Sequence, residues 1–131
     1  MADTFLSKTL VLANTSQTTL YTVPATDDTA IPPTPSTTAL IKSIRLYNSH
    51  TSNVLVTLTF TDKDSDTGAD TESTLFKMNL PATDATTDSF PIGNPFEVLK
   101  MPLVANEGDA IKITAGPAAK IHVQLSVLEI T

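Results

Sequence analysis

Residues 38–61 read TALIKSIRLYNSHTSNVLVTLTFT, and this stretch determines which fold the sequence predicts. Apolar side chains recur at every second position in both of its halves, which is the pattern of strands that are buried on one face. These positions are Leu40, Ile44 and Leu46 in the first half and Val54, Val56, Leu58 and Phe60 in the second. Residues 48–53 between the halves are small or polar and suit a turn. The stretch therefore predicts a long β-hairpin.

The composition of the whole chain is that of a β-rich globular protein. Its 131 residues have the length of one ordinary domain, and the 40% that are hydrophobic are enough for a buried core. Only 5% of the residues are aromatic and Trp is absent, so we expect a core of Leu, Ile and Val. Thr is abundant, and its β-branched side chain favours an extended backbone.

The net charge of −6 makes nucleic acid an unsuitable partner, because affinity for phosphates comes largely from Lys and Arg. Arg45 is the single arginine of the chain. The absence of Cys excludes disulfides and thiolate metal sites. Residues 1–17 lack the pattern of a signal peptide, and no segment approaches the roughly 18 apolar residues that span a bilayer. We therefore expect neither nucleic acid nor a membrane as a partner.

Shorter alternating patterns predict the remaining strands. They lie at residues 9–13, 18–23, 73–80, 96–101, 110–114 and 120–130. In this prediction the first two strands form a small hairpin, and the last two form a closing hairpin around Gly116 and Pro117.

These strands, without a credible amphipathic helix, predict an all-β fold. We expect an eight-stranded antiparallel β-sandwich of the jelly-roll type, with an Ig-like sandwich as the alternative. A single sandwich domain is expected at residues 9–131. We expect residues 1–8 to form an N-terminal arm, with an edge strand as the alternative. Residues 25–37 form a proline-rich surface loop. In the last strand, Leu128 and Ile130 lie opposite to the buried face, so either a bulge resets the register or another subunit covers them.

Residues 62–72 form an acidic loop and are the candidate for a metal site. A calcium loop places oxygen ligands at alternate positions, with Gly sixth and Glu twelfth. Here Thr67 occupies the glycine position and Glu72 comes one residue early. The carboxylates at matching positions are Asp62, Asp64, Asp66 and Asp70. We favour a solvated hairpin tip whose charges block edge pairing, with calcium as the weaker alternative, and we expect no cofactor.

The sequence indicates no catalytic site. His50 falls in a turn and His122 falls on the more polar face of the last strand. No nucleophile motif and no phosphate-binding glycine cluster is present, so we expect that the protein is not an enzyme. Arg45 and Tyr47 share one strand face with Ile41 under strict alternation. This mixed patch is either an interface or the exposed face of a sheet.

Several stretches resemble a pattern found in small virion proteins of tailed bacteriophages. They are residues 20–25 (LYTVPA), 39–48 (ALIKSIRLYN), 54–60 (VLVTLTF), 103–113 (LVANEGDAIKI) and 122–130 (HVQLSVLEI). Within that group the chain looks most like a capsid decoration, or cement, protein. The resemblance implies a jelly-roll subunit, commonly a homotrimer, on the outer capsid surface of the virion, assembled in the host cytoplasm. Its implied partner is the major capsid protein.

On this resemblance we expect two kinds of contact. The residues expected to touch the capsid are Phe5, Leu6, Ile31, Pro32 and Pro33, and those expected to touch sister subunits are Ile41, Arg45, Tyr47, Leu128 and Ile130. A structural component of the phage neck or tail is the alternative position. A glycan-binding module of a tail or adhesin is the alternative function. Sugar sites usually present aromatic platforms, which a chain with two tyrosines and no Trp supplies poorly.

Overall fold

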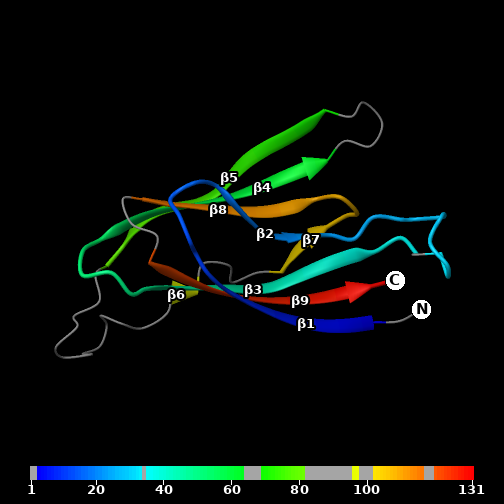
Figure 1. Cartoon of the computed structure of the whole chain (residues 1–131), viewed down its shortest axis with the longest axis horizontal. Coiled ribbons are helices and arrows are strands. Elements are labelled where there is room, and N and C mark those ends of the chain that lie inside the picture. Colours follow the sequence, from blue (N-terminus) through cyan, green and yellow to red (C-terminus); the bar gives the residue numbers. More distant parts are fainter. Residues whose placement is uncertain (1–2, 34, 64–68, 82–95, 98–101, 117–119) are drawn as a thin grey trace.

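Alternating apolar side chains fold the chain into two antiparallel sheets that stack face to face (Figure 1). The computed structural model describes residues 3–33, 35–63, 69–81, 96–97, 102–116 and 120–131. Strands supply the regular secondary structure of these residues.

The two layers contain four strands each when one interrupted strand is counted once. The first layer, here called the β3–β9 sheet, has the order β1 (Asp3–Val11), β9 (Ile121–Ile130) and β3 (Thr38–Asn48), with β6 (Phe96–Glu97) and β7 (Leu103–Ala105) on the outer edge of β3. The second, the β4–β8 sheet, has the order β2 (Thr18–Thr22), β8 (Ala110–Gly116), β4 (Val54–Lys63) and β5 (Asp70–Leu80). Because β6 and β7 pair with successive parts of β3, they form one interrupted edge strand.

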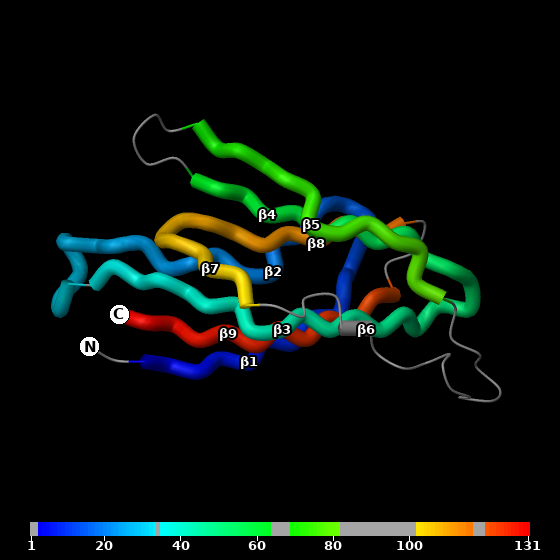
Figure 2. The backbone as a smooth tube through the Cα atoms, turned by 180° about the vertical axis from the view of Figure 1, so that it is seen from behind, coloured from blue at the N-terminus to red at the C-terminus, as the bar shows by residue number. Residues whose placement is uncertain are grey.

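This strand order confirms the predicted jelly roll. Consecutive strands alternate between the two layers, and among the described strands the β4–β5 hairpin is the exception (Figure 2). In an Ig-like sandwich the first two strands share a sheet, whereas here β1 and β2 lie in different sheets. The Ig-like alternative is therefore wrong.

The hairpin predicted at residues 38–61 is wrong in its pairing, although both of its strands exist. β3 pairs with β9, while β4 pairs with β5 and β8, so residues 49–53 carry the chain from one layer to the other. The predicted hairpins of β1 with β2 and of β8 with β9 are corrected in the same way. The alternation of apolar and polar residues is the same whether two strands pair in one sheet or face each other across the core. The pattern therefore does not show which strand a given strand pairs with.

The arm predicted at residues 1–8 is also corrected, because residues 3–8 belong to β1. The register runs from Asp3 opposite Ile130 to Val11 opposite His122. Residues 3–11 (DTFLSKTLV) lack a strict alternation of apolar and polar residues, so the sequence pattern does not predict the full length of this strand. Of the strand predicted at 96–101, β6 is the described part, and residues 98–101 lie outside the described residues.

The core between the sheets is aliphatic, as the composition predicts. The largest side chains with less than 2% exposure are Ile41, Ile44, Leu46, Leu58, Leu80, Ile111, Ile113, Ile121, Leu125, Val23, Val54 and Val56. They come from the inner faces of both sheets. The predicted inner face of β9, which is Ile121, Val123, Leu125 and Val127, is buried throughout and is thereby confirmed.

A polar contact closes the core near the end of β9. Tyr21 is 3% exposed, and its hydroxyl donates a 2.5 Å hydrogen bond to Oε1 of Glu129. Lys8 Nζ lies 5.5 Å from the centre of the same ring. Burial and the Glu129 carboxylate raise the pKa of Tyr21, so its hydroxyl keeps the proton that the hydrogen bond needs.

A β-bulge at Lys42 decides which residues of β3 face the core. The register with β9 shifts between Ile41 and Ser43. Ala39 and Ile41 are wholly buried before the bulge, and Ile44 and Leu46 are wholly buried after it. The expectation that Leu40 shares the inner face with Ile44 is therefore wrong, because one extra residue exchanges the two faces.

This bulge predicts opposite outcomes for two adjacent substitutions. Ile41→Ala leaves a cavity in the core and should lower the free energy of unfolding by about 2–5 kcal/mol. Leu40→Ala removes a half-buried side chain from the outer face and should cost roughly 1 kcal/mol or less. Urea denaturation of the two variants and the native chain measures both values. A larger loss for Leu40→Ala would contradict the bulged register.

Candidate functional site on the β3–β9 sheet

The outer face of the β3–β9 sheet carries an apolar row that crosses four strands. Phe5 on β1 is opposite Leu128 on β9, Leu128 is opposite Leu40 on β3, and Leu40 is opposite Val104 on β7. Residues directly opposite one another share a face of the sheet. Phe5 is 77% exposed and Val104 is 58% exposed, so both ends of this apolar row are open to solvent.

The outer face of the β4–β8 sheet is polar by comparison. Its cross-strand rows are Thr114–Thr57–Lys77 and Thr19–Lys112–Thr59–Thr74. Lys112 also makes a 3.3 Å ion pair with Glu72. Leu55 and Leu75 are exposed on this layer, at 39% and 40%. The two outer faces of the sandwich therefore differ, and the apolar one is the better candidate for a contact surface.

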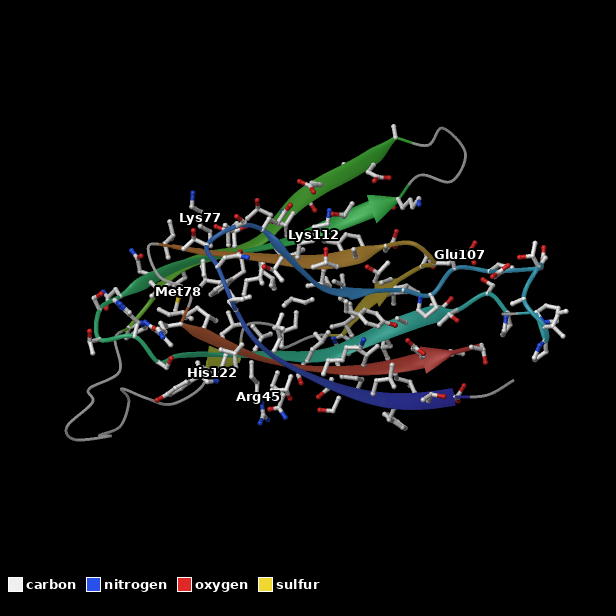
Figure 3. The ribbon with its side chains drawn as sticks, in the orientation of Figure 1. Arg45, Lys77, Met78, Glu107, Lys112 and His122 are labelled. Atoms are coloured by element: carbon white, nitrogen blue, oxygen red, sulfur yellow. The ribbon has the colours of Figure 1, made fainter. Side chains whose placement is uncertain are left out.

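Further along the outer face of the β3–β9 sheet lies a groove of about 360 Å³. The residues that line it are Thr9, Arg45, Leu46, Tyr47, His122, Val123 and Gln124. The rings of Tyr47 and His122 meet edge to face, with centroids 5.7 Å apart and an interplanar angle of 74°. Figure 3 shows Arg45 and His122 on the side of β3 and β9 that faces away from the β4–β8 sheet. The groove and the apolar row thus occupy one face.

The proline-rich loop lies at the same end of the molecule as the apolar row. Thr38, where the loop enters β3, lies opposite Ile130, which in turn lies opposite Asp3. Ile31 in this loop is 98% exposed. In Figures 1 and 2 the loop lies at the end of the sandwich where the N- and C-termini also lie.

Glu107 holds the base of this loop. Its Oε2 accepts hydrogen bonds from the Thr26 amide at 3.2 Å and from the Thr26 hydroxyl at 2.7 Å. These two bonds, together with one from the Ser36 hydroxyl, lower the pKa of Glu107. Thr26 precedes the tip of the loop and Ser36 follows it, so one carboxylate ties the two legs together.

The structure brings most of the predicted contact residues onto one face or one end. Phe5, Arg45, Tyr47, Leu128 and Ile130 lie on the outer face of the β3–β9 sheet, and Ile31, Pro32 and Pro33 are exposed in the adjoining loop. Two of the expected contact residues do not lie on that face. Leu6 points inward and packs against the core, and Ile41 is wholly buried because of the bulge.

Sequence reasoning missed Leu40, Val104 and Gln124 as parts of this face. Leu40 is turned outward by the bulge, and Val104 joins the row through the pairing of β7 with β3. Neither the bulge nor that pairing has a local signal in the sequence. The second apolar group of β7 next to Leu103 could have suggested that this strand has apolar side chains on both faces.

The acidic loop is shorter than predicted. Asp62 belongs to β4 and Asp70 belongs to β5, while Asp64 and Asp66 lie outside the described residues. β4 and β5 pair as a hairpin up to Lys63 opposite Asp70, as expected. Among the described residues, no group of three or more His, Cys, Asp or Glu could hold a metal ion.

In that part of the chain, no helix is long and apolar enough to cross a membrane.

No protein-family model matches the sequence, and neither does any curated protein. Two solved structures have weak structural similarity to the chain. A chain in the structure of infectious bursal disease virus, Gt strain, is 14% identical with a TM-score of 0.39, over 99% of this chain and 31% of that one. A mutant VP2 protein of the same virus, in derived T=1 particles, is 11% identical with a TM-score of 0.34, over 97% and 35%. This chain thus spans about a third of each.

The Glu107 contacts predict a pH-dependent loop. A carboxyl whose pKa is lowered in the folded state stabilises its contacts above its unfolded pKa, and that stabilisation is lost as the pH falls through the folded pKa. The Thr26 amide chemical shift should therefore titrate with a midpoint below the ordinary pKa of Glu, because these hydrogen bonds favour the charged carboxylate. NMR spectra between neutral and acidic pH measure it.

The control for this titration is Asp27, because it is the acidic residue next to Thr26 and hydrogen bonds from Thr29 lower its pKa as well. Asp27→Asn should leave the Thr26 titration in place, whereas Glu107→Gln should remove it. A Thr26 titration that persists in Glu107→Gln would show that another group controls the loop.

Proposed function

We propose that this protein is a structural component of a virus particle, and specifically a cement protein that binds the outer surface of a phage capsid. The observation that carries the proposal is the apolar row Phe5–Leu128–Leu40–Val104 on one outer face, set against the polar rows of the other. The resemblance of several stretches to virion proteins and the jelly-roll strand order support it.

An apolar row on a sheet face costs free energy while it remains in water. Burying it against a protein surface removes that cost, at about 25 cal/mol for each Å² of apolar area. The row crosses four neighbouring strands, so it offers a continuous line of apolar side chains that can lie along a seam between two capsid subunits. A ligand that binds only the assembled shell shifts the equilibrium towards the shell, and this effect is the clamping action of a cement protein.

The β4–β8 sheet then faces outward. The exposed Lys77 and Thr74 on β5 and the acidic residues at the end of β4 and the start of β5 keep that face hydrated. The role requires no catalysis and no cofactor. Self-association as a homotrimer is part of the proposal, with Ile130 nearest to the sister subunits, because Leu128 belongs to the row that faces the shell. The solution mass, measured by light scattering, gives the number of subunits.

Substitutions at the two exposed ends of the apolar row test the proposal. Phe5→Ser with Val104→Ser should weaken binding to undecorated shells of the virus that encodes the chain by about 10- to 100-fold. The free energy of unfolding should change by roughly 1 kcal/mol or less, because both side chains are mostly exposed. Co-sedimentation with the shells measures binding, and urea denaturation measures stability.

The matched control is the double variant Leu55→Ser with Leu75→Ser, which removes two exposed leucines from the other layer. It should bind as the native chain does. Equal losses in the two double variants, or no loss in the first, would overturn the assignment of the β3–β9 sheet as the contact face.

A further inference from the structure

The groove beside the apolar row lies between two neighbouring rows of the outer face. In one row Thr9, Gln124 and Arg45 are opposite one another on β1, β9 and β3. In the next row His122 on β9 is opposite Tyr47 on β3. Side chains from three strands therefore surround one space of about 360 Å³, a size typical of sites that hold a small group.

The side chains around this groove share one chemical property. Arg45, Tyr47, His122, Gln124 and Thr9 each carry an N–H or O–H group that can donate a hydrogen bond. Among the residues that the structure describes, none of those lining the groove is acidic, in a chain with 14 acidic and 8 basic residues. The single arginine of an acidic protein thus sits among four other donors.

We propose that this groove binds a carboxylate group supplied by an acidic side chain of a partner protein. The guanidinium of Arg45 presents paired N–H groups that match the two oxygens of a carboxylate. Gln124 and Thr9, in the same row as Arg45, supply further donors. The ring carbons of Tyr47, which meets His122 edge to face, offer an apolar surface against which the methylene groups of a glutamate can pack.

Other anionic ligands fit this groove less well. Nucleic acid binding needs several cations along a surface, whereas Arg45 is the sole Lys or Arg among the described residues that line the groove, and the chain carries a net charge of −6. A sugar ring usually stacks flat on an aromatic face, and the 74° angle between Tyr47 and His122 leaves no coplanar platform. A carboxylate on a short side chain is small enough to contact Arg45 and the neutral donors Gln124 and Thr9 at the same time.

One acidic residue of this chain lies near the groove in the register. Glu97 on β6 is the cross-strand partner of Arg45. The experiment therefore includes a variant in which the charge at this position is removed. The proposed carboxylate site is inferred from the residues around the groove and does not depend on the capsid-binding function. It stands or falls independently of that function.

The experiment is an NMR titration of the native chain with N-acetyl-glutamate N-methylamide, with the glutamine analogue as the neutral comparison. Ionic strength is held constant, because salt screens an exposed charge pair. The glutamate probe should cause saturable shifts of the His122 and Tyr47 ring signals and of the Gln124 amide. These shifts should be at least about fivefold larger than those caused by the glutamine probe.

Three variants and one further probe complete the test. Arg45→Gln should abolish the response, while Lys112→Gln, which removes the same charge from the other outer face, should preserve it. Glu97→Gln should bind the glutamate probe at least as tightly as the native chain. A flat titration in both the native chain and Glu97→Gln, or equal responses to the two probes, would overturn the carboxylate site. Tighter binding of glucuronate than of the glutamate probe would show that the occupant is an acidic sugar and that the proposed partner is wrong.

Discussion

The fold depends on burying the inner faces of two sheets against each other. The chain has no cysteine, and its core is built almost entirely from Leu, Ile and Val side chains on alternate positions of β3, β4, β8 and β9. β3 and β9 pair over nearly their whole lengths, and both lie inside their sheet rather than at its edge. Because the core uses only the inner faces, the two outer faces are free to differ in composition. The candidate site is the more apolar of the two, the outer face of the β3–β9 sheet.

The bulge at Lys42 connects the packing of the core with the composition of the outer face. Without the extra residue, strict alternation would turn either Leu40 inward or Ile44 outward. With it, Ile41 and Ile44 both reach the core, and Leu40 completes the row between Leu128 and Val104. Bulges commonly re-aim side chains next to functional surfaces. Here a single inserted residue serves core packing and a continuous apolar row at once.

Buried polar groups fix the crossings between the layers, which cannot use the short turns of hairpins. Asn48 donates from Nδ2 to the carbonyl oxygens of Ser52, Leu80 and Pro81, so it ties the β3–β4 crossing to the end of β5. Asp109 is 3% exposed and accepts hydrogen bonds from the amides of Lys63 and Asn106, at 2.9 and 2.8 Å. These side chains satisfy backbone donors and acceptors that the sheets leave unpaired. These hydrogen bonds therefore tie the crossing segments to strands of the sandwich.

The sequence by itself determined that the chain is all-β and where most strands lie, because the alternation of apolar side chains is a local property of the backbone. It also determined the inner face of β9 and the aliphatic nature of the core. Only the tertiary structure decided which strands are neighbours, that residues 3–8 form an edge strand, and that Leu6 and Ile41 point inward. The groove unites Thr9, Arg45 and His122, which are far apart in the chain and meet through the pairing of β1, β9 and β3. The alternation of apolar and polar residues indicates which side chains of a strand are buried. The neighbour of a strand is set by hydrogen bonds between segments that are distant in the sequence, and no local pattern specifies that neighbour.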